Sequence, residues 1–217
     1  MTQKTGVSRR SMLQSSLGGV ALLTAAPLLQ AALPTPHQTE GPFFPLHDQA
    51  DKDLDLTLIK GHAEHAQGEV LEVRGQVLDT DGKPVADALV DVWQANSHGR
   101  YAHERDPNPA PLDPHFQGWA KLTTDAEGRF RFRTIKPGAY PVAEGWTRPP
   151  HIHLKVARRG FHELTTQMYF AGDALNEIDR LLLAVPEAER AGLVVAFANV
   201  NGGGAPSGQF GIVLRRV

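Results

Sequence analysis

The stretch Arg129-Phe130-Arg131-Phe132-Arg133 alternates strictly between a charged and an aromatic residue, and it follows the turn sequence Asp125-Ala126-Glu127-Gly128. Side chains of a β-strand point to opposite faces in turn. The alternation therefore predicts a strand with one face buried in a core and the other face in solvent.

Further strand patterns occur on both sides of this stretch, separated by turn residues. One segment alone has a helical pattern, residues 176–183, with a weak continuation after Pro186. Short strands at turn-punctuated intervals indicate a mainly β protein, and we expect an antiparallel β-sandwich with long loops and at most one or two short helices. The expected strands are residues 70–78, 88–94, 119–123, 129–133, 152–157, 164–170, 193–198 and 210–214.

Composition narrows the function classes. The 217 residues suit one domain, and a formal net charge of -2 with no basic stripe argues against a nucleic-acid partner. The chain has no cysteine, which excludes disulfides, thiolate metal sites and cysteine nucleophiles. Ten histidines remain as candidates for metal ligands.

The N-terminal residues 1–32 have the features of an export signal. Arg9 and Arg10 precede an uncharged apolar stretch over residues 17–29, and Ala31 and Ala32 follow it. This pattern favours a cleavable twin-arginine signal over an anchor helix or a chance basic pair. The apolar stretch is too short for a stable membrane span. We expect export to the periplasm by the twin-arginine route, and one mature domain over residues 33–217.

The segment His151-Ile152-His153 is the sharpest local motif. In a strand, residues two apart share a face, so both imidazoles can converge on one metal ion while Ile152 points to the opposite layer. Taken alone, such a pair is more often incidental on a surface strand. Pro149 and Pro150 stiffen the approach, and a polyproline-like period of three places Arg148 along the same edge as His151. Arg148 then either forms an ordinary surface ion pair or faces a metal pocket.

Tyr101 and Tyr140 are two of only three tyrosines, and both stand in loops rich in glycine or proline. The ordinary interpretation of each is a half-buried loop aromatic. As metal ligands they would have to ionise, which costs about 4 kcal/mol each at neutral pH. A hard trivalent cation supplies that energy readily, so two phenolates with two imidazoles would select ferric iron.

Several blocks of the sequence, in order, resemble the intradiol ring-cleavage dioxygenases of the protocatechuate 3,4-dioxygenase β-subunit type. The resemblance runs from Thr39 to about Asp173. The blocks are Thr39-Glu40-Gly41-Pro42-Phe43-Phe44-Pro45, Val92-Trp93-Gln94-Ala95-Asn96, Gly99-Arg100-Tyr101, Pro111-Leu112-Asp113-Pro114, Phe130-Arg131-Phe132-Arg133-Thr134-Ile135-Lys136-Pro137-Gly138, Tyr140-Pro141, Arg148-Pro149-Pro150-His151-Ile152-His153 and Gln167-Met168-Tyr169-Phe170.

This resemblance implies one non-haem Fe(III) ion held by Tyr101, Tyr140, His151 and His153. It further implies that Tyr140 leaves the iron when a catechol binds, and that Arg148 stabilises negative charge on the substrate ring.

The implied substrate pocket contains Gln167 and the arm residues Gly41 and Pro42. Trp93 corresponds to a packing residue behind the site.

The implied activity is cleavage of a catecholic ring with dioxygen to a cis,cis-muconate-type diacid. Val142 stands where the protocatechuate enzymes carry an aromatic residue, and the N-terminal helical region of catechol 1,2-dioxygenases is missing. Catechol, protocatechuate, hydroxyquinol and larger aromatics therefore stay open as substrates. Because the family often assembles two related chains, we expect either a homo-oligomer or a heteromer with a related chain.

Two alternatives from other classes stay open. A metal-dependent hydrolase would use His151, His153 and a carboxylate such as Asp113. A non-catalytic β-sandwich would bind aromatics, ferric iron or a partner protein without consuming dioxygen.

Overall fold

The computed structural model describes residues 32–199 and 203–217. The expected export signal, residues 1–32, lies outside these residues except for Ala32. Within the described ranges, no helix is long and apolar enough to cross a membrane.

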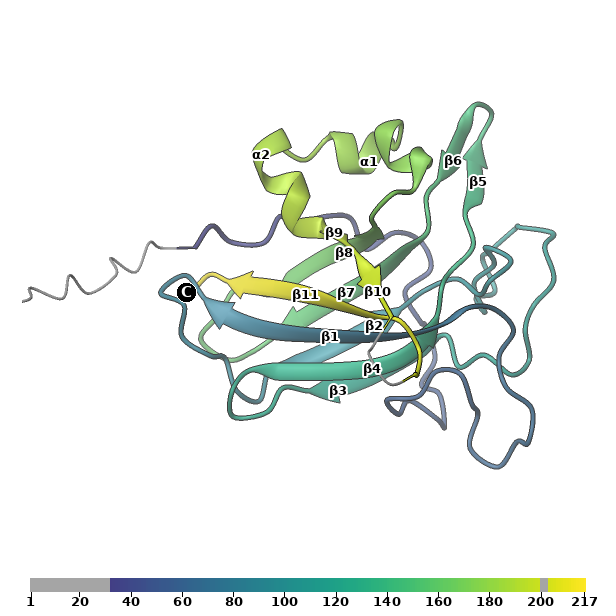
Figure 1. The fold of residues 1–217 in the computed structure, drawn as a ribbon, viewed down its shortest axis with the longest axis horizontal. Helices are drawn as coiled ribbons and strands as arrows, with labels where there is room; N and C mark the ends of the chain where they lie inside the picture. Colours follow the sequence, from purple (N-terminus) through teal and green to yellow (C-terminus); the bar gives the residue numbers. More distant parts are fainter. Residues whose placement is uncertain (1–31, 200–202) are drawn as a thin grey trace, which may run out of the picture.

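Two packed sheets and a small hairpin make up the fold (Figure 1). The four-stranded sheet has the order β10-β11-β1-β4, the five-stranded sheet has the order β3-β2-β7-β8-β9, and β5 and β6 form the hairpin. The strands are β1 (Val70–Asp79), β2 (Leu89–Trp93), β3 (Trp119–Thr123), β4 (Arg129–Ile135), β5 (Tyr140–Ala143), β6 (Trp146–Arg148), β7 (His151–Ala157), β8 (Leu164–Phe170), β9 (Val194–Val195), β10 (Phe197–Ala198) and β11 (Ser207–Leu214).

The mainly β architecture predicted from the sequence is confirmed, but the sheets are mixed. β1 pairs with β11 in parallel, and β8 pairs with β9 in parallel. The expected strand over residues 193–198 is divided, because Val194–Val195 belongs to the five-stranded sheet and Phe197–Ala198 to the four-stranded sheet. The chain thus crosses between the sheets at Ala196, and β11 then enters beside β1 in the same direction.

The helical segment is shorter and more broken than its pattern predicted. It consists of a 3-10 turn (Ala174–Glu177), α1 (Arg180–Leu183), α2 (Glu187–Arg190) and a second 3-10 turn (Ala191–Leu193). Asp179 has extended backbone and caps α1, accepting a hydrogen bond from the Leu182 amide at 3.0 Å. This capping interaction, which aspartate favours, interrupts the helix expected over residues 176–183.

The main core lies between the two sheets. In β4, Phe130 and Phe132 are buried while Arg129, Arg131 and Arg133 are exposed, which confirms the alternation predicted for this strand. Ile152, Leu154 and Val156 of β7 enter the same core. A second cluster, Trp93, Ala95, Tyr101, Trp119 and Tyr140, lies apart from it, with Phe43 and Phe44 packed against it. This second cluster surrounds the candidate site.

Candidate metal centre and its pocket

The floor of the site is the face of the five-stranded sheet that points away from the sandwich core. Ile152 and Leu154 face the core, so His151 and His153 face outward, and both are almost completely buried under loops. Cross-strand register places Trp93 of β2 and Gln167 of β8 on either side of His153, and Tyr169 of β8 beside His151. The predicted shared face of the two histidines is confirmed.

Two loops bring the tyrosines to this floor, and glycines allow them to touch. The amides of Gly99 and Gly138 both donate to the carbonyl oxygen of Asn96, at 3.0 and 2.9 Å. Gly99 has φ of 78°, and a Cβ there would collide with the Ala139 carbonyl oxygen. A Cβ on Gly138 would lie 2.5 Å from the Gly99 nitrogen. Glycine at both positions therefore sets the Tyr101 loop directly against the strand start at Tyr140.

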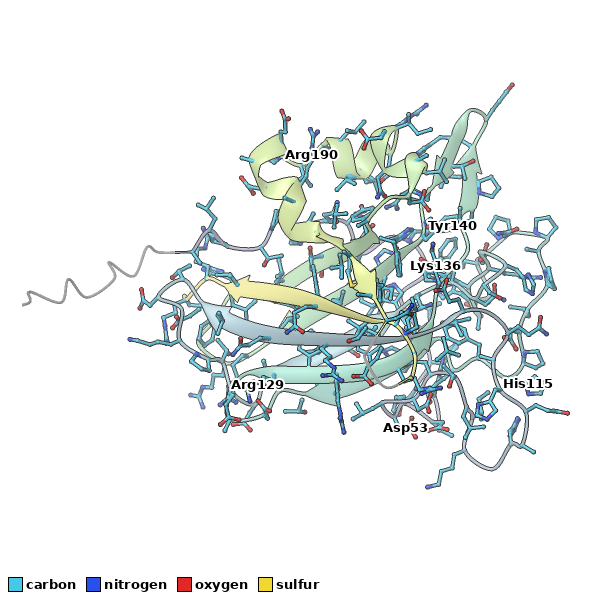
Figure 2. All side chains as sticks on the ribbon, viewed as in Figure 1. Asp53, His115, Arg129, Lys136, Tyr140 and Arg190 are labelled. Carbon is cyan, nitrogen blue, oxygen red and sulfur yellow. The ribbon has the colours of Figure 1, made fainter. Side chains whose placement is uncertain are left out.

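The four candidate ligands converge. The phenol oxygens of Tyr101 and Tyr140 each lie 3.4 Å from Nε2 of His151. The two tyrosine rings are 5.7 Å apart between centroids, and the two histidine rings are 4.9 Å apart. Tyr140 lies at the base of the β5–β6 hairpin (Figure 2). Residues from a loop, a hairpin and a sheet strand thus form one buried cluster.

The histidines are held in place and are neutral. Nδ1 of His151 lies 2.7 Å from the Pro149 carbonyl oxygen, so Nδ1 carries the proton and the Nε2 lone pair faces the two phenols. His153 stacks on Trp93 with centroids 4.7 Å apart and an interplanar angle of 11°. Burial, and then the Arg148 charge, lower the pKa of His151 well below its ordinary value and that of His153 to about 3.

This donor set fits ferric iron. Burial raises the pKa of Tyr101 well above its ordinary value and also raises the pKa of Tyr140, so without a cation both phenols stay protonated. Only a strongly polarising ion would offset the free-energy cost of ionising both phenols inside the protein. Two hard oxygen donors and two imidazoles in one buried cluster suit a trivalent metal better than zinc or ferrous iron.

Arg148 lies next to the cluster in a network of buried polar side chains. Its Nε donates to Oδ1 of Asp179 at 2.8 Å, and its Nη2 donates to Oε1 of Gln167 at 2.6 Å and to the Tyr169 hydroxyl at 3.1 Å. Burial opposes its charge, but the neighbouring Tyr169 and Asp179 outweigh this and raise the pKa of Arg148. The surface ion pair considered for Arg148 is wrong, because its partner Asp179 is fully buried.

The route by which Arg148 reaches the site also differs from the expectation. Arg148 ends strand β6 and pairs with Tyr140 of β5, so the hairpin register places it beside Tyr140, whereas the polyproline period had related it only to His151. Sequence reasoning missed Asp179, which anchors Arg148, because nothing in the sequence links it to residue 148. It also missed the role of Tyr169, although Tyr169 stands two residues from Gln167 on one strand, which puts both on the same face.

A pocket of about 860 Å³ opens beside the cluster. Tyr140, Arg148 and His153 line it, as do Gly41 and Pro42 of the N-terminal arm. The arm is pinned by Phe43, whose ring lies 4.8 Å from the Tyr101 ring, and by Lys155, which binds Glu40 at 3.0 Å. Gln167 does not line the pocket; it lies behind Arg148 and donates to the Thr39 carbonyl oxygen at 2.9 Å.

The residues named for a metal-dependent hydrolase do not assemble. Among the residues that the structure describes, no three histidine, aspartate or glutamate side chains gather as a metal site. Asp113 instead accepts hydrogen bonds from the backbone amides of Gln67 at 2.7 Å and His115 at 3.0 Å, and holds two loops together.

The lowered pKa of His153 predicts how the metal-free protein responds to acid. The unfolded chain binds a proton at the ordinary pKa of 6.5, whereas the folded chain resists it down to about 3. The contribution of this group to the free energy of unfolding is therefore fully present above pH 6.5. It decreases by about 1.4 kcal/mol per pH unit as the pH drops from 6.5 toward 3. Urea unfolding of iron-free protein at pH 7, 6 and 5 measures the slope. His153→Gln should lower the slope by about this amount, while buried His151, whose pKa is also lowered, keeps its own contribution. Equal slopes in both proteins would contradict the prediction.

Fold and site together define a class: a mainly β domain whose outer sheet face carries two tyrosines and two histidines at the edge of a pocket. The family model described as "Dioxygenase" matches residues 39–215. The chain belongs to the intradiol ring-cleavage dioxygenase family and is an enzyme of that kind.

Individual relatives agree with this family. The protocatechuate 3,4-dioxygenase beta chain of Burkholderia cepacia is 46% identical over 180 residues, which cover 80% of this chain and 76% of the relative. The alpha chain from the same organism is 37% identical over 168 residues, covering 74% of this chain and 82% of the relative. A solved dioxygenase domain of a carbohydrate-binding fusion from Streptomyces sp. SirexAA-E is 31% identical with a TM-score of 0.62, covering 85% of this chain and 99% of that domain.

Proposed function

We propose that this chain is an Fe(III)-dependent intradiol dioxygenase whose metal ligands are Tyr101, Tyr140, His151 and His153. The observation that carries the proposal is the placement of both phenol oxygens at 3.4 Å from Nε2 of His151. A non-catalytic sandwich that binds only aromatics would not require two buried phenol groups directed at an imidazole. When bound, ferric iron would act as a Lewis acid that favours catecholate binding and reaction of the ring with dioxygen.

The two tyrosines differ in position, and this supports different roles. Tyr140 lines the pocket and stands on a hairpin, whereas Tyr101 does not line it and has a backbone amide that donates to Asp106 at 2.7 Å. Tyr140 is therefore the candidate ligand that an entering catechol would meet, and the one that would give way to it. As a phenolate, its oxygen would be the group on this chain placed to take a proton from a substrate hydroxyl.

Arg148 faces the same pocket with a permanent charge. Asp179 and Gln167 hold its guanidinium at Nε and Nη2, which fixes the orientation of the group. It stabilises negative charge that develops on the ring. The product is a cis,cis-muconate-type diacid, which contains both atoms of dioxygen.

We also propose how the enzyme assembles and where it is located. The relatives include both an alpha and a beta chain of protocatechuate 3,4-dioxygenase, which supports assembly with a related chain or with a second copy. The twin arginines Arg9 and Arg10 support export to the periplasm. All four candidate ligands and the arm residues Gly41 and Pro42 come from this one chain.

The visible absorption spectrum of the purified protein, recorded with its iron content, tests the proposal. A broad visible band that scales with iron is expected from tyrosinate bound to ferric iron. Consumption of dioxygen when a catechol is added would complete the result. Stoichiometric iron without the band would remove both tyrosines from the metal, and iron and catechol binding without dioxygen uptake would favour the non-catalytic alternative.

A further inference from the structure

The pocket is far larger than a catechol ring requires. Its volume of about 860 Å³ falls in the range of roughly 300–1,000 Å³ that encloses drug-sized ligands. A substrate whose ring approaches the cluster at Tyr140 and His153 leaves most of this space empty unless the ring carries a large substituent.

The walls away from the cluster are mainly apolar. The β5–β6 hairpin contributes Pro141, Val142, Ala143 and Trp146, and Leu181 of α1 lies on the same pocket. Figure 1 shows this hairpin projecting from the end of the sandwich, next to α1. Val142 is 49% exposed, although it is a large apolar residue. Apolar side chains gathered around a concave site indicate a ligand with apolar surface to bury.

The charges around the pocket do not favour an anionic substituent. Three carboxylates line it, from Glu40, Asp106 and Glu144, against two cations, Arg105 and Arg148, and Glu40 is paired with Lys155 at 3.0 Å. The charge of Arg148 is balanced by Asp179 at 2.8 Å. Arg105 is exposed at the rim and forms no ion pair with another described residue, so of the two pocket cations it is the one whose charge is not already paired with a carboxylate.

We propose that the preferred substrates are catechols with a bulky, uncharged, apolar substituent such as an aryl or branched alkyl group, rather than carboxylated catechols such as protocatechuate. This inference rests on the proposed intradiol activity. The substituent lies between the hairpin and Leu181, and displaces water from the apolar walls there.

Oxygen uptake by the iron-loaded enzyme on four compounds tests this preference: catechol, 4-phenylcatechol, 4-tert-butylcatechol and protocatechuate. We expect kcat/KM for 4-phenylcatechol to exceed that for protocatechuate by about tenfold or more. Equal values, or a higher value for protocatechuate, would overturn the proposal, and loss of the protocatechuate rate in Arg105→Gln would then assign carboxylate recognition to Arg105. Failure to consume any of the four would instead count against the proposed function.

A variant of the wall provides the second readout. Val142→Trp fills space on the hairpin and should lower the ratio of kcat/KM for 4-phenylcatechol to that for catechol by about tenfold. Leu112→Trp is the matched control, because Leu112 is 50% exposed and does not line the pocket, and its ratio should equal that of the parent. The visible band of each variant reports whether the metal centre is intact. An unchanged ratio in Val142→Trp would overturn the placement of the substituent.

Discussion

Replacing Tyr101 by phenylalanine is expected to remove most of the visible absorption and to lower oxygen uptake at least about 100-fold. The new side chain keeps the ring that packs against Phe43 at 4.8 Å and Tyr140 at 5.7 Å, so the loop should stay folded. It loses the buried oxygen that faces Nε2 of His151. The measurement is iron content and visible spectrum on the same sample, followed by oxygen uptake with catechol.

The three tyrosines of the chain provide an internal control for this experiment. Tyr140→Phe should also lose the band, because its oxygen lies at the same distance from His151. Tyr169→Phe should keep iron and colour, because the Tyr169 hydroxyl contacts Arg148 and Gln167 and not a candidate ligand atom. If Tyr101→Phe retains full iron and an unchanged band, Tyr101 is not a ligand.

Replacing Arg148 by methionine is expected to destabilise the protein by about 3–5 kcal/mol and to lower kcat/KM strongly. The side chain of Asp179 is completely buried and would lose its cation, and a lone buried charge is costly. Urea unfolding gives the stability, and oxygen uptake gives the activity.

A second substitution separates these two effects. Asn at position 179 removes the charge and still caps α1, because asparagine is as good a cap as aspartate. Adding Asp179→Asn to Arg148→Met should therefore restore much of the stability but none of the activity. If activity returned together with stability, Arg148 would act only through folding and not on the substrate.

The parts of the fold that sequence patterns predicted are those with a strong local period. β3 and β8 have the expected bounds, and the outward pair His151 and His153 follows from alternation alone. The β5–β6 hairpin was not predicted, because Pro141 and the short β6 strand gave a turn pattern. The parallel pairing of β11 with β1 joins residues far apart in the chain, which no local period reports.

The candidate site shows the same division between residues that local sequence patterns predict and residues that they do not. The ligand candidates stand in motifs that the sequence displays, whereas the residues that hold them come from distant segments. Asp179 meets Arg148 through the arrangement of the 3-10 turn and α1, and Gln38 reaches the Tyr169 hydroxyl at 3.1 Å from the N-terminal arm. Such contacts depend on tertiary packing, so only the folded chain reveals them.

The contact between Gly99 and Gly138 constrains how this enzyme can evolve. The two backbones touch there, so an insertion or a larger residue in either loop shifts one phenol relative to the other. We therefore expect the lengths of the two loops to be constrained together. At the tip of the β5–β6 hairpin no neighbouring loop makes such a contact, since a Cβ on Gly145 would meet nothing within 4 Å, although the φ of 70° at Gly145 itself still favours glycine. Divergence among descendants of this chain should therefore accumulate at the hairpin tip, where it changes the range of accepted substrates and leaves the spacing of the tyrosines intact.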